Sequence, residues 1–152
     1  GEIGNGHVVK LVNNTIAAAN RIAMLEAVAM GRKYGLSLET MNDVINKSSG
    51  RSGATERGLP AMIEGHASSN FALALMLKDV SLATQLGANC GAPMLLHGIV
   101  RGMLQAGLYE QGADANFTSI AQKLKDVDSI NADAVCPVST SSKGLASKLL
   151  FG

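Results

Sequence analysis

The strongest constraint on the fold is a run of 29 residues, from His7 to Gly35, that contains no proline and whose commonest residue is alanine. Because alanine is the best helix former and the pattern is unbroken, this run predicts one helix of about 40 Å. Most positions around its circumference are apolar, so we expect it to be buried on nearly all sides, within its own domain or against a partner. Gly35 suits the position that ends such a helix.

The rest of the chain also shows helical patterns, and no run of β-branched residues alternates with polar ones. Ser37 is a predicted N-cap, and Pro93 a predicted first-turn residue. We expect the further helices at Ser37 to Asn46, Ala54 to Glu64, 71–91, Pro93 to Tyr109, and 118–127. The predicted fold is therefore all-α, a helical bundle around one long central helix. It occupies residues 1–126, and residues 127–152 form a tail, a linker or a vector-derived segment.

Composition excludes several classes of function. The 13 Lys and Arg residues nearly balance the 12 Asp and Glu residues, and five Phe and Tyr with no Trp offer no base-stacking platform, so nucleic acid is not an expected partner. No apolar stretch reaches the about 18–20 residues of a membrane span, and no signal peptide is expected. Cys90 and Cys136 match no zinc pattern, which predicts reduced thiols, no metal site and a cytoplasmic location.

The glycine-rich start, "GEIGNG", is not typical of a phosphate-binding loop, because it lacks the GK[ST] ending and the third glycine of a dinucleotide fingerprint. The residues that follow are more informative. Lys10, Asn13 and Asn14 project from one side of the predicted helix, and Ala17 continues that stripe with room above it, before Arg21. Their flanks are apolar, and polar groups in apolar surroundings need partners. The pattern fits either a functional site or a buried polar network that serves the structure alone.

Lys78 is a second lysine of interest. Its neighbours on the helical wheel are Phe71, Leu75 and Leu82, which form an apolar stripe. The plain alternative to a functional role is a lysine that covers the core with its stem and keeps its ammonium group in water.

Three ordered motifs together resemble one family. They are G-x-G-x3-K-x2-N-N at residues 4–14, followed by the long alanine-rich helix, "NKSSGRS" at 46–52 and "KDVSLA" at 78–83. This arrangement resembles the β-hydroxyacid dehydrogenases related to 3-hydroxyisobutyrate dehydrogenase, over roughly residues 1–126. It is similar to their C-terminal all-helical domain, as in enzymes like 6-phosphogluconate dehydrogenase. The resemblance implies an NAD or NADP cofactor, bound mainly by an N-terminal Rossmann domain that is absent from this sequence.

The resemblance also implies roles for single residues. Lys10 falls on the catalytic lysine, and Asn14 on the asparagine that orients the substrate beside it. Lys78 falls on a lysine near the nicotinamide end of the cofactor, and Asp79 belongs to the same motif. Asn13 and Gly6 are assigned to the substrate side, where the glycines let the chain turn tightly and bring Lys10 against the substrate.

The implied reaction is oxidation of a short hydroxy acid, or reduction of the matching semialdehyde. A lysine suits the proton transfer that accompanies movement of a hydride. Two alternatives stay open: a non-catalytic oligomerisation module of the same fold, and a stand-alone helical binding protein. 3-Hydroxyisobutyrate, tartronate semialdehyde, four-carbon sugar acids and short semialdehydes all fit this plan. The expected partners are this small substrate, the chain's own Rossmann domain, and further copies in a homodimer or homotetramer.

Overall fold

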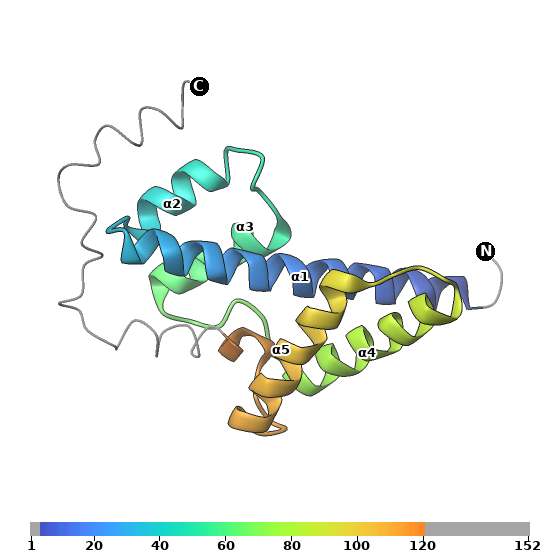
Figure 1. Cartoon of the computed structure of the whole chain (residues 1–152). Coiled ribbons are helices and arrows are strands. Elements are labelled where there is room, and N and C mark those ends of the chain that lie inside the picture. Colours follow the sequence, from blue (N-terminus) through green and yellow to red (C-terminus); the bar gives the residue numbers. More distant parts are fainter. Residues whose placement is uncertain (1–3, 121–152) are drawn as a thin grey trace.

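The computed structural model describes residues 4–120, which form five α-helices and one short 3-10 helix (Figure 1). The elements are α1 (Asn5–Lys33), α2 (Leu38–Ile45), α3 (Gly53–Glu64), α4 (Leu73–Asn89), α5 (Leu95–Gln111) and η1 (Phe117–Ser119). Within residues 4–120 there is no strand, only an isolated bridge between Ala72 and Asn116. The all-α prediction is confirmed for this part of the chain. The predicted tail at 127–152 lies outside it.

The 29-residue helix α1 contacts each of the other four α-helices (Figure 1). The core residues of α1 recur every three or four positions, as Ala18, Ile22, Leu25 and Val28, which is the spacing of one helix face. The side chains that α3, α4 and α5 bury most completely in this core are Leu59, Leu73, Val80, Val100 and Leu104.

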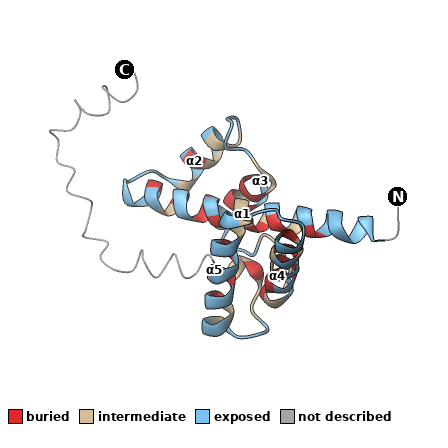
Figure 2. Cartoon of the chain, turned by 45° about the vertical axis from the view of Figure 1, so that its right-hand side comes forward, coloured by how far each residue is buried: buried red, intermediate tan, exposed pale blue. Residues whose placement is uncertain are grey.

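The first part of α1 is not buried on nearly all sides, so that expectation is wrong within this chain. Val9 is 66% exposed, Val12 52% and Ile16 53%, and Figure 2 shows this end of the helix extending beyond the others. The physical reason is that α2 and α3 pack near the other end of α1, so α4 is the main neighbour of these first turns (Figure 1). One side of the helix is covered there, and the other faces solvent.

Glycines end α1 and α4, and the sequence predicts this for Gly35. At the end of α1, Gly35 has a φ of 98°, and the N–H of Leu36 donates to the carbonyl of Gly31 at 3.0 Å. Gly91, with a φ of 70°, ends α4 in the same way. Both ends are Schellman motifs, in which a left-handed residue reverses the chain.

One predicted helix boundary needs correction, and another predicted helix lies mostly outside the described residues. Pro93 is not in the first turn of α5, because the turn closed by Gly91 places Met94 at the N-cap and Leu95 at the first helical position. Of the predicted helix at 118–127, the structure describes only the start: η1 includes residues 118 and 119, the Asn116 side chain accepts the N–H of Thr118 at 2.9 Å, and Ile120 is helical. Residues 121–127 lie outside the described part of the chain.

The exposed apolar side chains of α1 predict self-association. We expect this 15.7 kDa chain to sediment as a dimer or larger at micromolar concentration, because uncovered apolar surface of this kind recruits a partner. Val9→Lys combined with Val12→Lys should shift the equilibrium towards monomer. Val44→Lys is the matched control, since Val44 is 58% exposed but lies on α2. A wild-type monomer in sedimentation equilibrium would contradict the prediction.

Candidate active site

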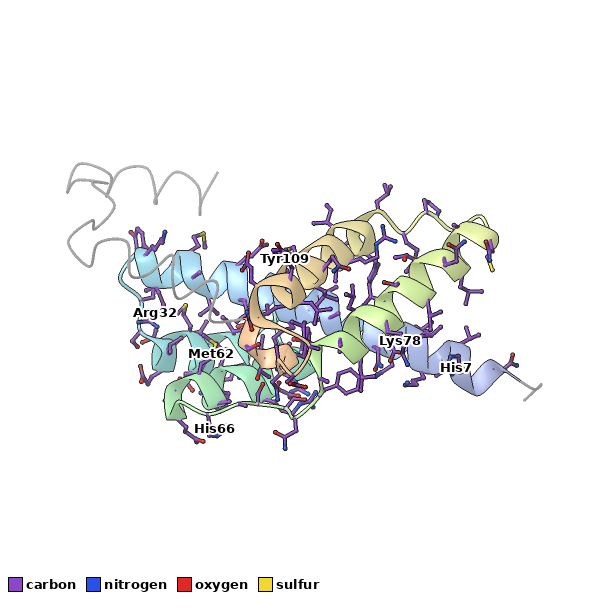
Figure 3. The ribbon with its side chains drawn as sticks, turned by 90° about the horizontal axis from the view of Figure 1, so that it is seen from below. His7, Arg32, Met62, His66, Lys78 and Tyr109 are labelled. Carbon is purple, nitrogen blue, oxygen red and sulfur yellow. The ribbon has the colours of Figure 1, made fainter. Side chains whose placement is uncertain are left out.

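The packing of α4 along the first turns of α1 brings two of the sequence motifs together. Lys10, Asn13 and Asn14 lie on α1, and Lys78 and Asp79 lie on α4, more than 60 residues away in sequence. Figure 3 shows Lys78 beside the turn of α1 that carries His7. The side chain of Asp79 is only 1% exposed, and it is the centre of the cluster.

One oxygen of the Asp79 carboxylate contacts both the predicted catalytic lysine and the asparagine predicted to orient the substrate. Its Oδ2 lies 3.2 Å from the Nζ of Lys10 and accepts a 2.7 Å hydrogen bond from the Nδ2 of Asn14. The Nδ2 of Asn13 in turn donates to the Oδ1 of Asn14 at 3.2 Å. The other carboxylate oxygen, Oδ1, is 3.6 Å from the Nζ of Lys78. The structure therefore joins Lys10, Asn13, Asn14, Lys78 and Asp79 in one network.

Sequence reasoning did not predict the contact between Asp79 and Lys10, because it placed Asp79 on the cofactor side with Lys78. A signal was present in the pattern of α4. Asp79 follows Met76 by three positions and precedes Ala83 by four, which puts a carboxylate on the buried face of the helix. A buried carboxylate requires a cation or hydrogen-bond donors from a neighbouring helix. Lys10 and Asn14 supply them.

The surroundings of Asp79 keep it ionised. Burial alone would raise the pKa of this carboxyl group. The hydrogen bonds from Asn14 and Lys10, together with the positive charges of Lys10 and Lys78, outweigh burial and hold the pKa below its ordinary value of 3.8. The Oδ1 atom is buried and accepts no hydrogen bond within residues 4–120. Asp79 thus holds its charge, and the positive charge nearest to its Oδ1 is that of Lys78.

Lys10 is less enclosed than its apolar flanks predicted. Its side chain is 50% exposed, and that of Lys78 is 56% exposed, because both lie at the end of the molecule where α1 is covered on one side only. Gly6 and Asn13 are also exposed. A Cβ atom at Gly6 would meet nothing within 4 Å, so within this chain no close approach requires glycine there. The positive φ of 101° belongs to Gly4, the N-cap of α1.

Beyond Asn14, the same side of α1 borders a pocket of about 430 Å³. Asn13, Asn14 and Ala17 all line it, which confirms the room predicted above the small side chain of Ala17. Arg21 follows as the next polar residue of the wall. The pocket therefore begins at the cluster around Asp79 and continues along the helix.

Residues 4–120 contain neither a cluster of metal-ligand side chains nor a helix suited to crossing a membrane. No group of three or more His, Cys, Asp or Glu side chains within residues 4–120 is arranged to hold a metal ion. Across the same residues, none of the helices combines the length and hydropathy that a membrane crossing requires.

The lowered pKa of Asp79 predicts a loss of stability in acid. Below pH 4 the unfolded chain takes up a proton at Asp79 before the folded chain does, so stability falls as pH drops through the lowered folded pKa. Asp79→Asn should cost about 1–3 kcal/mol at pH 7, where it weakens charge-assisted hydrogen bonds. It should also flatten the decline below pH 4. Urea unfolding of both chains between pH 2.5 and 7 measures this, and parallel pH profiles would contradict it.

Comparison with known proteins identifies the family. Residues 4–124 match the family model described as "NAD-binding of NADP-dependent 3-hydroxyisobutyrate dehydrogenase". The chain is 36% identical over 108 residues to 2-(hydroxymethyl)glutarate dehydrogenase of Eubacterium barkeri, an alignment that includes 70% of this chain and 36% of the relative. It is 32% identical over 137 residues to the mitochondrial 3-hydroxyisobutyrate dehydrogenase of Rattus norvegicus, with coverage of 83% and 40%. Because that relative is mitochondrial by name, the cytoplasmic location stays a prediction.

A solved structure shows the same fold. The 3-hydroxyisobutyrate dehydrogenase of Mycobacterium tuberculosis, determined with L-serine, superposes with a TM-score of 0.71 at 28% identity. The match covers 80% of this chain and 44% of that one. The chain thus spans about two fifths of the length of these relatives. By the family match over residues 4–124, the chain belongs to the NAD(P)-dependent 3-hydroxyisobutyrate dehydrogenase family.

Proposed function

We propose that this chain is the C-terminal, catalytic domain of an NAD(P)-dependent β-hydroxyacid dehydrogenase, in which Lys10 is the acid–base residue. The observation that carries the proposal is the ion pair of Lys10 with Asp79, whose carboxylate Asn14 also holds. This cluster pairs a half-exposed lysine with a buried anion at the open end of α1. An exposed ammonium group next to a pocket can reach a bound substrate, as a proton-transfer residue must.

The reaction converts a hydroxy acid and NAD(P)⁺ into a semialdehyde, NAD(P)H and a proton. The nicotinamide, when bound, takes the hydride from the carbon that carries the hydroxyl group. Lys10 handles the proton: its neutral amine accepts the hydroxyl proton during oxidation, and its ammonium form returns it during reduction. Asp79 fixes the Nζ of Lys10 in position. Asn14 has two amide hydrogens, of which one is donated to Asp79, so the second is available to a substrate oxygen.

Lys78 and Asp79 are suited to contact the nicotinamide end of the cofactor. Lys78 is half-exposed and its ammonium group is held beside Asp79, so that group is accessible to a polar group of a ligand. These residues would face the nicotinamide end. A Rossmann domain would bind the pyrophosphate and decide between NAD and NADP. The exposed Val9 and Val12 offer apolar surface near Lys10 for that domain or for a second copy of the chain in a dimer or tetramer.

The names of two relatives suggest the substrate class. 3-Hydroxyisobutyrate and 2-(hydroxymethyl)glutarate both carry a hydroxymethyl group on the carbon next to a carboxylate. We therefore propose a short β-hydroxy acid of this type as substrate. The hydroxymethyl oxygen would lie at Lys10, with Asn14 and Asn13 towards the rest of the acid. We place the enzyme in the cytoplasm, where a free thiol such as that of Cys90 stays reduced.

Replacing Lys10 tests the catalytic assignment. In the enzyme carrying both domains, Lys10→Ala should lower kcat/KM by at least about a hundredfold, because the proton transfer loses its residue. Lys33→Ala is the matched control, since Lys33 is an exposed lysine in the last turn of the same helix. Circular dichroism of both variants verifies folding. Activity of Lys10→Ala within a few-fold of the wild type would instead favour the non-catalytic oligomerisation module.

Cofactor titration tests the division of labour between domains. We expect this 152-residue chain alone to bind neither NAD⁺ nor NADP⁺ appreciably in calorimetry, because its sequence holds no pyrophosphate-binding fingerprint. Adding the Rossmann domain should restore binding. Micromolar affinity of the chain by itself would show that the assignment of the pyrophosphate site to another domain is wrong.

A further inference from the structure

The pocket that begins at Asn14 is lined by positively charged side chains. It measures about 430 Å³, and two arginines line it together with amide and hydroxyl side chains. No carboxylate lines it among the residues that the structure describes. Besides Asn14, the polar side chains of its wall are those of Asn13, Asn20, Arg21, Arg57, Ser68 and Ser69. A pocket that holds two positive charges and no negative one is suited to an anion.

Arg21 is a buried cation that pairs with no carboxylate among residues 4–120. It is 7% exposed, its Nη2 donates to the Oγ of Ser68 at 2.6 Å, and its guanidinium lies 6.0 Å from the centroid of the Phe117 ring. Burial, and then the charge of Arg57, lower the pKa of Arg21. Placing a charged group in such surroundings is unfavourable unless something compensates it. The hydroxyl and the ring compensate only in part.

Arg57 adds a second charge at the rim of the same pocket. It is exposed, and among residues 4–120 it forms no ion pair with a carboxylate. Its guanidinium lies near Gly53, at the N-terminus of α3, and Gly53 and Ala54 also line the pocket. The positive end of the helix dipole adds to the field of both arginines. Unlike Arg21, this side chain has no evident structural contact to explain its place.

We propose that this pocket binds a second carboxylate group, at the end of the substrate away from the hydroxyl, so that the preferred substrates are dicarboxylic hydroxy acids. The inference rests on the proposed function, since it extends the site that begins at Lys10. Asn13 and Asn14 belong both to the cluster around Asp79 and to the pocket wall. The two sites are therefore continuous.

The dimensions suit a substrate of a few more carbons than 3-hydroxyisobutyrate. From Asn14 to Arg21 is seven residues, or about 10 Å along the helix. Arg57 lines the same pocket from α3, close enough to Arg21 for its charge to lower the pKa of Arg21. A guanidinium group binds a carboxylate through two parallel hydrogen bonds, so a carboxylate between the arginines would also relieve their mutual repulsion. A monocarboxylic acid that occupies the reaction end has no group to place there.

Ligand binding tests the pocket without any turnover. We expect the 152-residue chain to bind glutarate at least about tenfold more tightly than butyrate, measured by calorimetry or by NMR titration. Arg57→Gln should remove that difference, and Arg57→Lys should restore part of it, because lysine keeps the charge but not the paired hydrogen bonds. Arg101→Gln is the control, since it deletes an exposed positive charge on α5, away from this pocket.

Turnover gives a second readout in the enzyme with both domains. Arg57→Gln should raise KM for a dicarboxylic hydroxy acid at least about tenfold more than for 3-hydroxyisobutyrate. Equal binding of glutarate and butyrate, or glutarate affinity unchanged by Arg57→Gln, would overturn the inference. Failure of the proposed function has a different signature, namely full activity of Lys10→Ala. The comparison of glutarate and butyrate binding does not depend on turnover, so it would still test the pocket in that case.

Discussion

The candidate site depends on the interactions of the buried Asp79 carboxylate with Lys10 and Asn14. Taking a charge out of water costs free energy, and the chain offsets that cost with the hydrogen bond from Asn14 and the ion pair with Lys10. Both partners come from α1, so the carboxylate of α4 sets the position of α1's polar side chains. Because Lys10 is half-exposed, the pair contributes modestly to stability and more to the placement of the ammonium group.

Because α1 is long, the side chains of the candidate site and of the pocket follow one another along a single helix. Its first turns carry Lys10 and Asn14, and its middle carries Arg21. Its inner face holds core residues such as Ile22 and Val28. A rigid helix keeps these groups at set distances, whereas a loop would let them drift. Because α1 is so long, its first turns extend beyond the other helices (Figure 2). Val9 and Val12 lie in these turns and face solvent.

Capping residues and hydrophobic periodicity predicted where the helices lie better than they predicted how far each helix is buried. Gly35 ends α1, and Ser37 caps α2 by accepting the N–H of Thr40 at 3.1 Å, because both depend on residues close in sequence. Pro93 was misplaced because the turn at Gly91 takes up the residues before α5. Burial of α1 was overestimated for another reason. Periodicity shows which faces are apolar, but the number of neighbours decides which are covered.

By itself, the sequence determined that the chain is helical, that Lys10 and Asn14 share one side of a long helix, and that Lys78 and Asp79 form a second motif. These conclusions rest on spacing within one element. The tertiary structure decided that Asp79 contacts Lys10, and that Arg57 of α3 joins Arg21 around a pocket that no carboxylate of residues 4–120 lines. Such pairs are more than 30 residues apart in sequence. Only the packing of α3 and α4 against α1, driven by burial of their apolar faces, brings them together.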